Sequence, residues 1–100
     1  EAKEVVDVGG AALVAGFVDA HMHLESTKLW VDEFVRGALP CGTTAVACDP
    51  HEIANVAGLE GVGAVAEAAE KMPFTFGLAA SSCVPASSFE RCQEVSTYLG

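Results

Sequence analysis

The chain has 100 residues, of which 51% are hydrophobic and 19% are charged, and its formal net charge is −9. This composition is typical of one small globular domain and excludes a disordered chain. With 5 basic residues against 14 acidic ones, the chain has no Lys/Arg cluster to neutralise phosphates, so we expect no binding to nucleic acid or to an anionic membrane surface.

The apolar stretches also fall short of the roughly 20 residues that a membrane span requires. The first residues lack the basic and then apolar pattern of a secretory signal, so we expect a cytoplasmic protein. The four cysteines form no C-x-x-C pair and accompany an ordinary apolar core. We therefore expect reduced, mostly buried thiols at Cys41, Cys48, Cys83 and Cys92.

The first predicted element is a β-hairpin. Two apolar runs, Val5–Val8 and Ala11–Val14, flank Gly9-Gly10, a dipeptide suited to a tight turn. The second run continues through Gly16–His21 as an apolar strand.

The rest of the chain predicts helices that alternate with strands. Apolar residues at helical spacing follow the first polar loop, and a short β-branched run after them is typical of a strand buried on both faces of a parallel sheet. The predicted elements are a helix over Val31–Leu39, a strand over Thr43–Cys48, a helix over Leu59–Lys71, a strand over Phe74–Ala79, a loop over Ser81–Ser88 and a helix over Phe89–Leu99. This alternation implies an α/β fold with parallel pairing and right-handed crossovers.

Polar residues of the kinds used in catalysis follow each predicted strand. The carboxyl ends of parallel strands are where α/β folds gather their chemistry. These residues are His21, His23 and Glu25 after the first strand, Asp49, His51 and Glu52 after the second, and Ser81, Ser82 and Cys83 after the third.

His21 and His23 are the strongest candidates for metal ligands. Side chains two positions apart on a strand share a face, with Cα atoms roughly 6.6 Å apart, so both imidazoles can bind one ion at about 2.1 Å. The alternative is a pair of half-buried strand histidines that bond to backbone carbonyls. Asp19 is in phase with both, and it either orients one imidazole or is a solvated carboxylate at the strand end.

His51 and Glu52 extend this candidate site. Either residue can add a ligand, a substrate contact or a proton carrier, and the alternative for His51 is a helix-cap or loop position. A catalytic metal usually keeps three or more protein ligands, so the two histidines of the first strand do not complete a site by themselves.

The segment Gly16–His23 resembles the first-strand signature of the amidohydrolase superfamily, although Ala15 stands where that signature usually has proline. Asp49–Val56, Gly58–Gly61 and Ser82–Ala86, followed by Phe89-Glu90, resemble the bacterial adenine deaminases within that superfamily.

This resemblance implies a partial (β/α)8 TIM barrel. Residues 15–100 would supply its first three βα units, and residues 1–14 would form the end of a small β domain and the hairpin that leads into the barrel. Three units leave two apolar sheet edges open, so we expect a fragment of a longer protein that self-associates as a homo-oligomer.

The implied reaction is the hydrolysis of adenine to hypoxanthine and ammonia at a binuclear centre of Mn or Fe, with Zn as another possibility. The substrate would be a small purine. The resemblance implies His21 and His23 as metal ligands, and we expect catalytic roles for His51 and Glu52 and substrate contacts from Glu25, Ser82 and Cys83.

Two alternatives stay open: another amidohydrolase acting on cyclic or linear amides, and a non-catalytic α/β fragment that binds metal weakly. In either case we expect the fragment alone to be inactive.

Overall fold

The computed structural model describes residues 2–80. The expected loop over Ser81–Ser88, the helix over Phe89–Leu99 and the site residues Ser82 and Cys83 lie outside that range. The elements are β1 (Phe17–Met22), the short 3-10 helix η1 (Glu25–Thr27), α1 (Val31–Ala38), the 3-10 helix η2 (Leu39–Cys41), β2 (Thr43–Cys48), α2 (His51–Glu70) and β3 (Thr75–Leu78).

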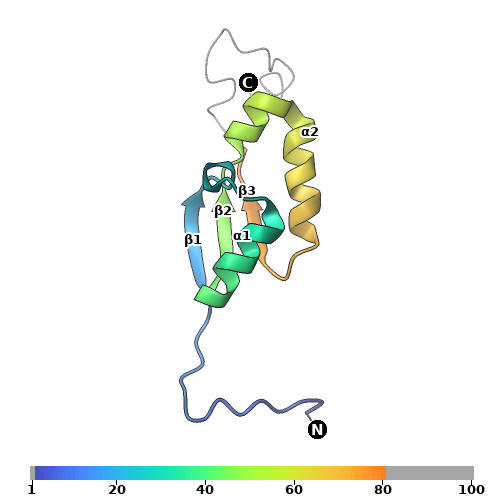
Figure 1. Ribbon diagram of the computed structural model, residues 1–100. Helices are drawn as coiled ribbons and strands as arrows, with labels where there is room; N and C mark the ends of the chain where they lie inside the picture. The colour runs from blue at the N-terminus through green and yellow to red at the C-terminus, as the bar shows by residue number, and fades with distance from the viewer. Residues whose placement is uncertain (1, 81–100) are drawn as a thin grey trace.

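The three strands form one parallel sheet in the order β1-β2-β3 (Figure 1). Asp19 pairs with Val46 across β1 and β2, and Val46 pairs with Phe76 across β2 and β3. The predicted parallel βαβαβ arrangement is therefore confirmed. All three strands run in one direction, so their carboxyl ends meet at one edge of the sheet.

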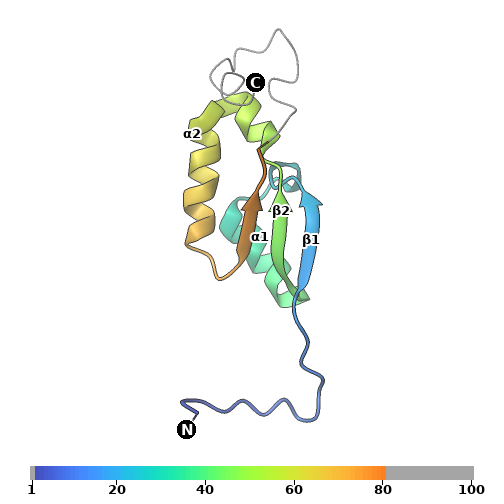
Figure 2. The same ribbon diagram turned by 180° about the vertical axis from the view of Figure 1, so that it is seen from behind.

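Within residues 2–80, helices cover one face of the sheet. Helix α1 lies in front of the strands in Figure 1 and behind them in Figure 2. On that covered face of β2, Val46 and Cys48 are 2% and 0% exposed, and they belong to a core with Leu24, Val31 and Val65. The opposite face of β2 is only half-buried, so the expected burial on both faces is wrong for this strand; no second layer covers that face within residues 2–80.

Helix α1 forms where the apolar spacing predicts it. Val31 and Val35 are buried one turn apart, and Asp32 and Glu33 occupy the first turn, where the helix dipole favours negative charge. Pro40 in η2 then prevents the helix from continuing. Among the helices within residues 2–80, none is long and apolar enough to cross a membrane.

Helix α2 begins eight residues before the predicted start, at His51 rather than Leu59. The low helix propensity of its glycines obscured the first part, and the backbone departs from helical angles at Gly58, with φ 60° and ψ −152°. That region is open almost only to glycine. The prediction of one helix from Leu59 therefore located the second part of a kinked helix.

The predicted hairpin forms its turn without its strands. Gly9 and Gly10 have φ values of 61° and 82°, and the Ala11 amide donates to the Val8 carbonyl at 3.1 Å, as a tight turn requires. Neither flanking run is a strand in the structure, so the expected strand pairing is not observed within residues 2–14. Two strands alone gain little from pairing without a third strand or a helix against them.

Candidate metal centre and active site

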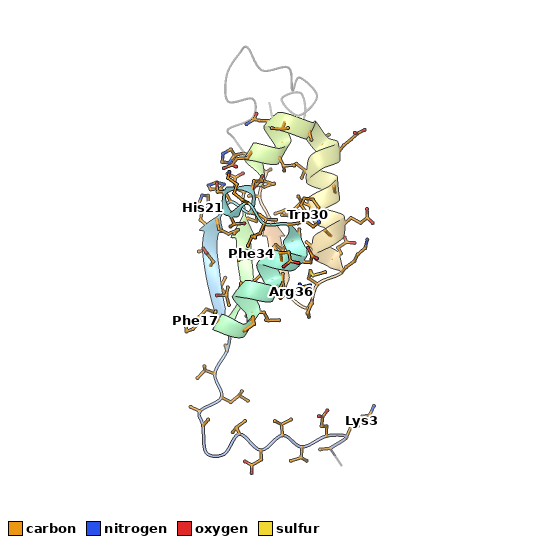
Figure 3. The ribbon with its side chains drawn as sticks, viewed as in Figure 1. Lys3, Phe17, His21, Trp30, Phe34 and Arg36 are labelled. Carbon is orange, nitrogen blue, oxygen red and sulfur yellow. The ribbon has the colours of Figure 1, made fainter. Side chains whose placement is uncertain are left out.

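The carboxyl ends of β1 and β2 bring three imidazoles into one row. The ring centroids of His21 and His23 lie 4.8 Å apart, and those of His23 and His51 lie 4.5 Å apart. Figure 3 shows His21 at the end of β1, at the opposite end of the strand from Phe17. His21 is exposed and the other two histidines are partly buried, so the row runs from the surface into the fold.

The nearest pair meets through its Nε2 atoms. His21 Nε2 lies 3.2 Å from His23 Nε2, as expected for side chains on the same face of a strand. His23 Nδ1 lies 2.9 Å from the backbone carbonyl of Asp49, which can only accept a hydrogen bond. His23 Nδ1 therefore carries a proton, and in the neutral imidazole Nε2 then presents a lone pair toward His21.

This arrangement fits a divalent metal ion. Two ligands that each lie about 2.1 Å from one ion can be at most about 4.2 Å apart, and the two Nε2 atoms meet that condition. A hydrogen bond from the second nitrogen of a ligand histidine to a carbonyl is the usual way in which proteins orient such a ligand. The same short approach also accommodates a proton shared by the two imidazoles.

Asp49 fixes this geometry through its backbone. Its amide donates to the Met22 carbonyl at 2.9 Å and continues the β1–β2 ladder beyond Cys48, while its carbonyl accepts from His23. The imidazole of His23 is thereby attached to the rigid part of the sheet.

The Asp49 side chain forms a second group of possible ligands. The candidate ligand atoms of His23, Asp49 and His51 all lie within 4.8 Å of one another. Asp49 Oδ2 lies 3.6 Å from His51 Nδ1, which is longer than an ordinary hydrogen bond. Asp49 Oδ1 and His51 Nδ1 are both buried without a hydrogen-bond partner in the described part of the chain, which is the environment that a cation or a water molecule satisfies.

Two side chains of η1 reach across to the start of α2. Glu25 Oε1 accepts a hydrogen bond from the Ile53 amide at 2.9 Å, and Ser26 Oγ donates to Glu52 Oε1 at 2.5 Å. The loop after β1 is therefore bonded to the helix that begins after β2, and both loops carry candidate site residues.

The structure brings together three of the predicted site residues, His21, His23 and His51. Glu52 follows His51 in the first turn of α2, and its carboxylate accepts a hydrogen bond from Ser26. Glu25 also lies at this edge, against the backbone of α2. Asp19 does not reach an imidazole: its Oδ1 accepts from the His21 backbone amide at 3.1 Å. The orientation of a histidine ring by Asp19 is therefore not observed.

Two residues of the site received no role in the sequence analysis. Asp49 was noted only for its place after the second strand, and its part in the cluster follows from that position. Ser26 carried no signal, because its partner Glu52 is 26 residues away in sequence.

Cys48 lies beneath this edge of the sheet as a buried free thiol. Burial raises the pKa of the thiol and is the largest cause of the shift; a hydrogen bond with the Leu24 backbone opposes it, and the negative charges of Glu25 and Asp49 raise the pKa further. The thiol is therefore held protonated. Within residues 2–80 both Cys41 and Cys48 are free, and the expected burial is found for Cys48 but not for Cys41, which is exposed.

Comparison with known proteins links this geometry to one enzyme family. The profile described as "Amidohydrolase family" matches residues 12–99. The chain is 47% identical over 91 residues to a protein named adenine deaminase from Bacillus velezensis, covering 91% of this chain and 16% of that protein. It is 42% identical over 95 residues to one from Petrotoga mobilis, covering 95% and 17%.

A third protein with that name, from Sulfurovum sp., is 53% identical over 78 residues, covering 78% of this chain and 15% of the relative. The chain thus spans about one sixth of the length of the curated relatives that it matches.

Proposed function

This chain belongs to the amidohydrolase family, and from that premise we propose that the protein carrying it is a metal-dependent deaminase that converts adenine to hypoxanthine. The observation that supports this most directly is the 3.2 Å approach of the His21 and His23 Nε2 atoms at the carboxyl end of a parallel sheet. The names of the relatives supply the substrate.

The proposed reaction is a hydrolysis. Water adds to C6 of the purine, the bond between C6 and the exocyclic nitrogen breaks, and that nitrogen leaves as ammonia after receiving a proton. No oxidant or reductant is required. The protein must therefore hold a nucleophilic water and move protons to and from the purine.

His21 and His23 would hold the divalent metal through their Nε2 atoms. When bound, such a metal supplies a nucleophile near neutral pH by lowering the pKa of water. The Nδ1 hydrogen bond from His23 to the Asp49 carbonyl orients this ligand. We propose Mn or Fe in a binuclear centre, with Zn as the alternative.

His51 and Glu52 would carry protons or bind the substrate. His51 Nδ1 lies 3.6 Å from Asp49 Oδ2 and has no hydrogen-bond partner in the described part of the chain, so this nitrogen is open to a water molecule or a cation held by the same carboxylate. The Ser26 hydroxyl restrains the Glu52 carboxylate, so Glu52 approaches a substrate from one direction. A bound purine would displace water from the site, which would strengthen the interaction of Asp49 with His51 and that of Ser26 with Glu52.

Ser82 and Cys83 stay proposed substrate contacts, and a substrate contact is one of two candidate roles for Glu25. Its Oε1 accepts from the Ile53 amide, so Oε2, which is buried without a hydrogen-bond partner in the described part of the chain, would be the atom that meets a substrate. We also propose that the three strands begin a (β/α)8 barrel, in which further strands would cover the open face of the sheet. A homo-oligomer in the cytoplasm is part of the same proposal.

The full-length protein, reconstituted with Mn²⁺ and given adenine, tests this function by ammonia release and hypoxanthine formation. We expect turnover in the wild type and a loss of more than about 100-fold in His21→Ala/His23→Ala, because removal of a ligand costs more than removal of its hydrogen-bond partner. The metal bound per chain, measured by elemental analysis, should fall in the double variant.

His51→Asn in the same experiment separates a ligand from a proton carrier. If His51 is a proton carrier, kcat should fall in the variant while the amount of bound metal stays unchanged. If His51 is a metal ligand, both kcat and the amount of bound metal should fall. Adenine that stays intact with the metal-loaded wild type would contradict the proposed function. Turnover of a cyclic or linear amide instead would favour another amidohydrolase activity.

A further inference from the structure

The first turn of α2 lacks a cap of its own. Pro50 occupies the N-cap position and makes no side-chain hydrogen bond to the helix. A helix leaves its first amide groups without partners inside the helix, and an N-cap side chain normally accepts from one of them. In α2 the third of these amides, at Ile53, donates instead to Glu25, which is 28 residues away in sequence.

The next residue of the loop makes a parallel contact. Ser26 Oγ donates to Glu52 Oε1, so adjacent residues of η1 hold adjacent residues of the helix. The Glu25 carboxylate also places negative charge at the positive end of the helix dipole, where it is stabilising. We call this pair of contacts, Glu25 to Ile53 and Ser26 to Glu52, the loop–helix latch.

The loop itself is anchored. Leu24, immediately before Glu25, is 2% exposed and belongs to the buried core, and Ile53 packs against the same core. The Thr27 hydroxyl closes the 3-10 turn by donating to the Leu24 carbonyl at 2.6 Å. Glu25 is therefore presented from a fixed turn and not from a free loop.

The latch connects the two halves of the candidate site. His23 lies two residues before Glu25, and His51 lies two residues before Ile53. The hydrogen bond between Glu25 and Ile53 therefore restrains the two chain segments that carry these histidines, whose rings lie 4.5 Å apart. Besides these two hydrogen bonds, the ring contact between His23 and His51 joins the same two segments.

From this geometry we propose that Glu25 is a positioning residue, which caps α2 across the site and, together with Ser26, sets the position of His51 and Glu52 relative to the His21 and His23 pair. This inference rests on the proposed deaminase function only for its kinetic consequences. The hydrogen bond to Ile53 can be tested without any turnover.

The experiment compares Glu25→Ala, Glu25→Gln and Ser26→Ala in the full-length, Mn²⁺-loaded protein. In Glu25→Ala we expect kcat for adenine to fall about 10- to 100-fold, with KM changed less than about threefold, because positioning and not substrate affinity is lost. Glu25→Gln keeps an oxygen that accepts from Ile53, so it should restore kcat to within about tenfold of the wild type. The kcat of Ser26→Ala should lie between the values for Glu25→Ala and Glu25→Gln.

Amide hydrogen exchange of the peptide that contains Ile53 supplies the readout independent of activity. Exchange should accelerate at least about tenfold in Glu25→Ala and should stay close to the wild-type rate in Glu25→Gln. Thr27→Val is the matched control: it removes the hydroxyl bond to the Leu24 carbonyl but keeps the backbone bond from the Thr27 amide to the same carbonyl, so the turn and the Glu25 contact should persist. It should change neither the exchange at Ile53 nor the ratio of kcat to KM.

The outcomes separate three explanations. If Glu25→Gln raises KM strongly while exchange at Ile53 is unchanged, Glu25 contacts the substrate and the positioning role is wrong. If Thr27→Val reproduces the effects of Glu25→Ala, general stability of the turn is responsible and the latch is also refuted. If wild type does not deaminate adenine, the exchange data still decide whether Glu25 caps α2.

Discussion

At the scale of single residues, the strand alternation predicted the most important contact in the site. His21 lies in β1 and His23 directly follows the last residue of this strand, and their Nε2 atoms meet at 3.2 Å, as a period of two residues continued past the strand end predicts. The sequence did not reveal that the Asp49 carbonyl orients His23, because that contact joins residues 26 positions apart. Every residue type carries a backbone carbonyl, so the identity of the residue at position 49 does not reveal that its carbonyl accepts this hydrogen bond.

The two described cysteines should differ sharply in reactivity. Cys41 is exposed, whereas burial raises the pKa of the Cys48 thiol and the carboxylates of Glu25 and Asp49 raise it further. Since the thiolate is the reactive form, a raised pKa keeps Cys48 protonated at pH 8, where an exposed thiol is partly ionised. We expect iodoacetamide at pH 8 to modify Cys41 at least about tenfold faster than Cys48.

Peptide mapping by mass spectrometry in the native and urea-unfolded protein measures both rates. Unfolding should remove the difference, because it removes the burial. Equal labelling in the native state would contradict the assignment of Cys48 to the core.

At the scale of elements, the predictions succeeded where local pattern and tertiary packing agree. The strand over Thr43–Cys48 has the predicted bounds, and the helix from Val31 differs only in its last turn, where η2 follows. Helix α2 was predicted too short because Asp49-Pro50 reads as a break and Gly58, Gly61 and Gly63 reduce helix propensity. Packing of Ala54 and Val65 on the core, together with the cap from Glu25, overrides that local preference.

The kink at Gly58 makes a second glycine sensitive to substitution. A Cβ at Gly61 would lie 2.7 Å from Ala57 Cβ and 2.8 Å from Ile53 Cγ1, closer than side-chain carbons approach. In an ordinary helix Gly→Ala stabilises, but here overpacking should dominate, so we expect Gly61→Ala to lower the free energy of unfolding by about 1 to 3 kcal/mol.

Gly63→Ala is the matched control two residues away. A Cβ at Gly63 meets nothing within 4 Å, so this change should raise the free energy of unfolding by about 0.5 to 1 kcal/mol. Urea unfolding of the full-length variants measures both. Stabilisation by Gly61→Ala would show that Ala57 and Ile53 move apart without cost and that the kink does not fix their positions.

At the scale of the whole molecule, the α/β class and the parallel order followed from the alternation of elements, and both are confirmed. The distribution of buried surface could not be predicted in the same way, because it depends on which faces of the sheet have neighbours. Helices cover one face of β2, and the strand is only half-buried on the other. The N-terminal arm, the segment before β1, extends away from the sheet (Figure 3). Val5 and Leu13 in this arm are 84% and 88% exposed.

The arm gives the last prediction, since its turn is formed while its strands are not. Gly9 and Gly10 already have the positive φ values of a hairpin turn, and apolar side chains on both sides lie in solvent. Further strands against Val5–Val8 and Ala11–Val14 would bury these side chains and satisfy their backbone groups. In the full-length protein we therefore expect the amides of both runs to exchange at least about 100-fold more slowly than in an unstructured peptide, a difference of roughly 3 kcal/mol. Hydrogen exchange with mass spectrometry measures this, with a synthetic peptide of the same residues as the control. Peptide-like exchange on both sides of the turn would show that the arm is a linker, and the assignment of residues 1–14 to a β domain would then be wrong.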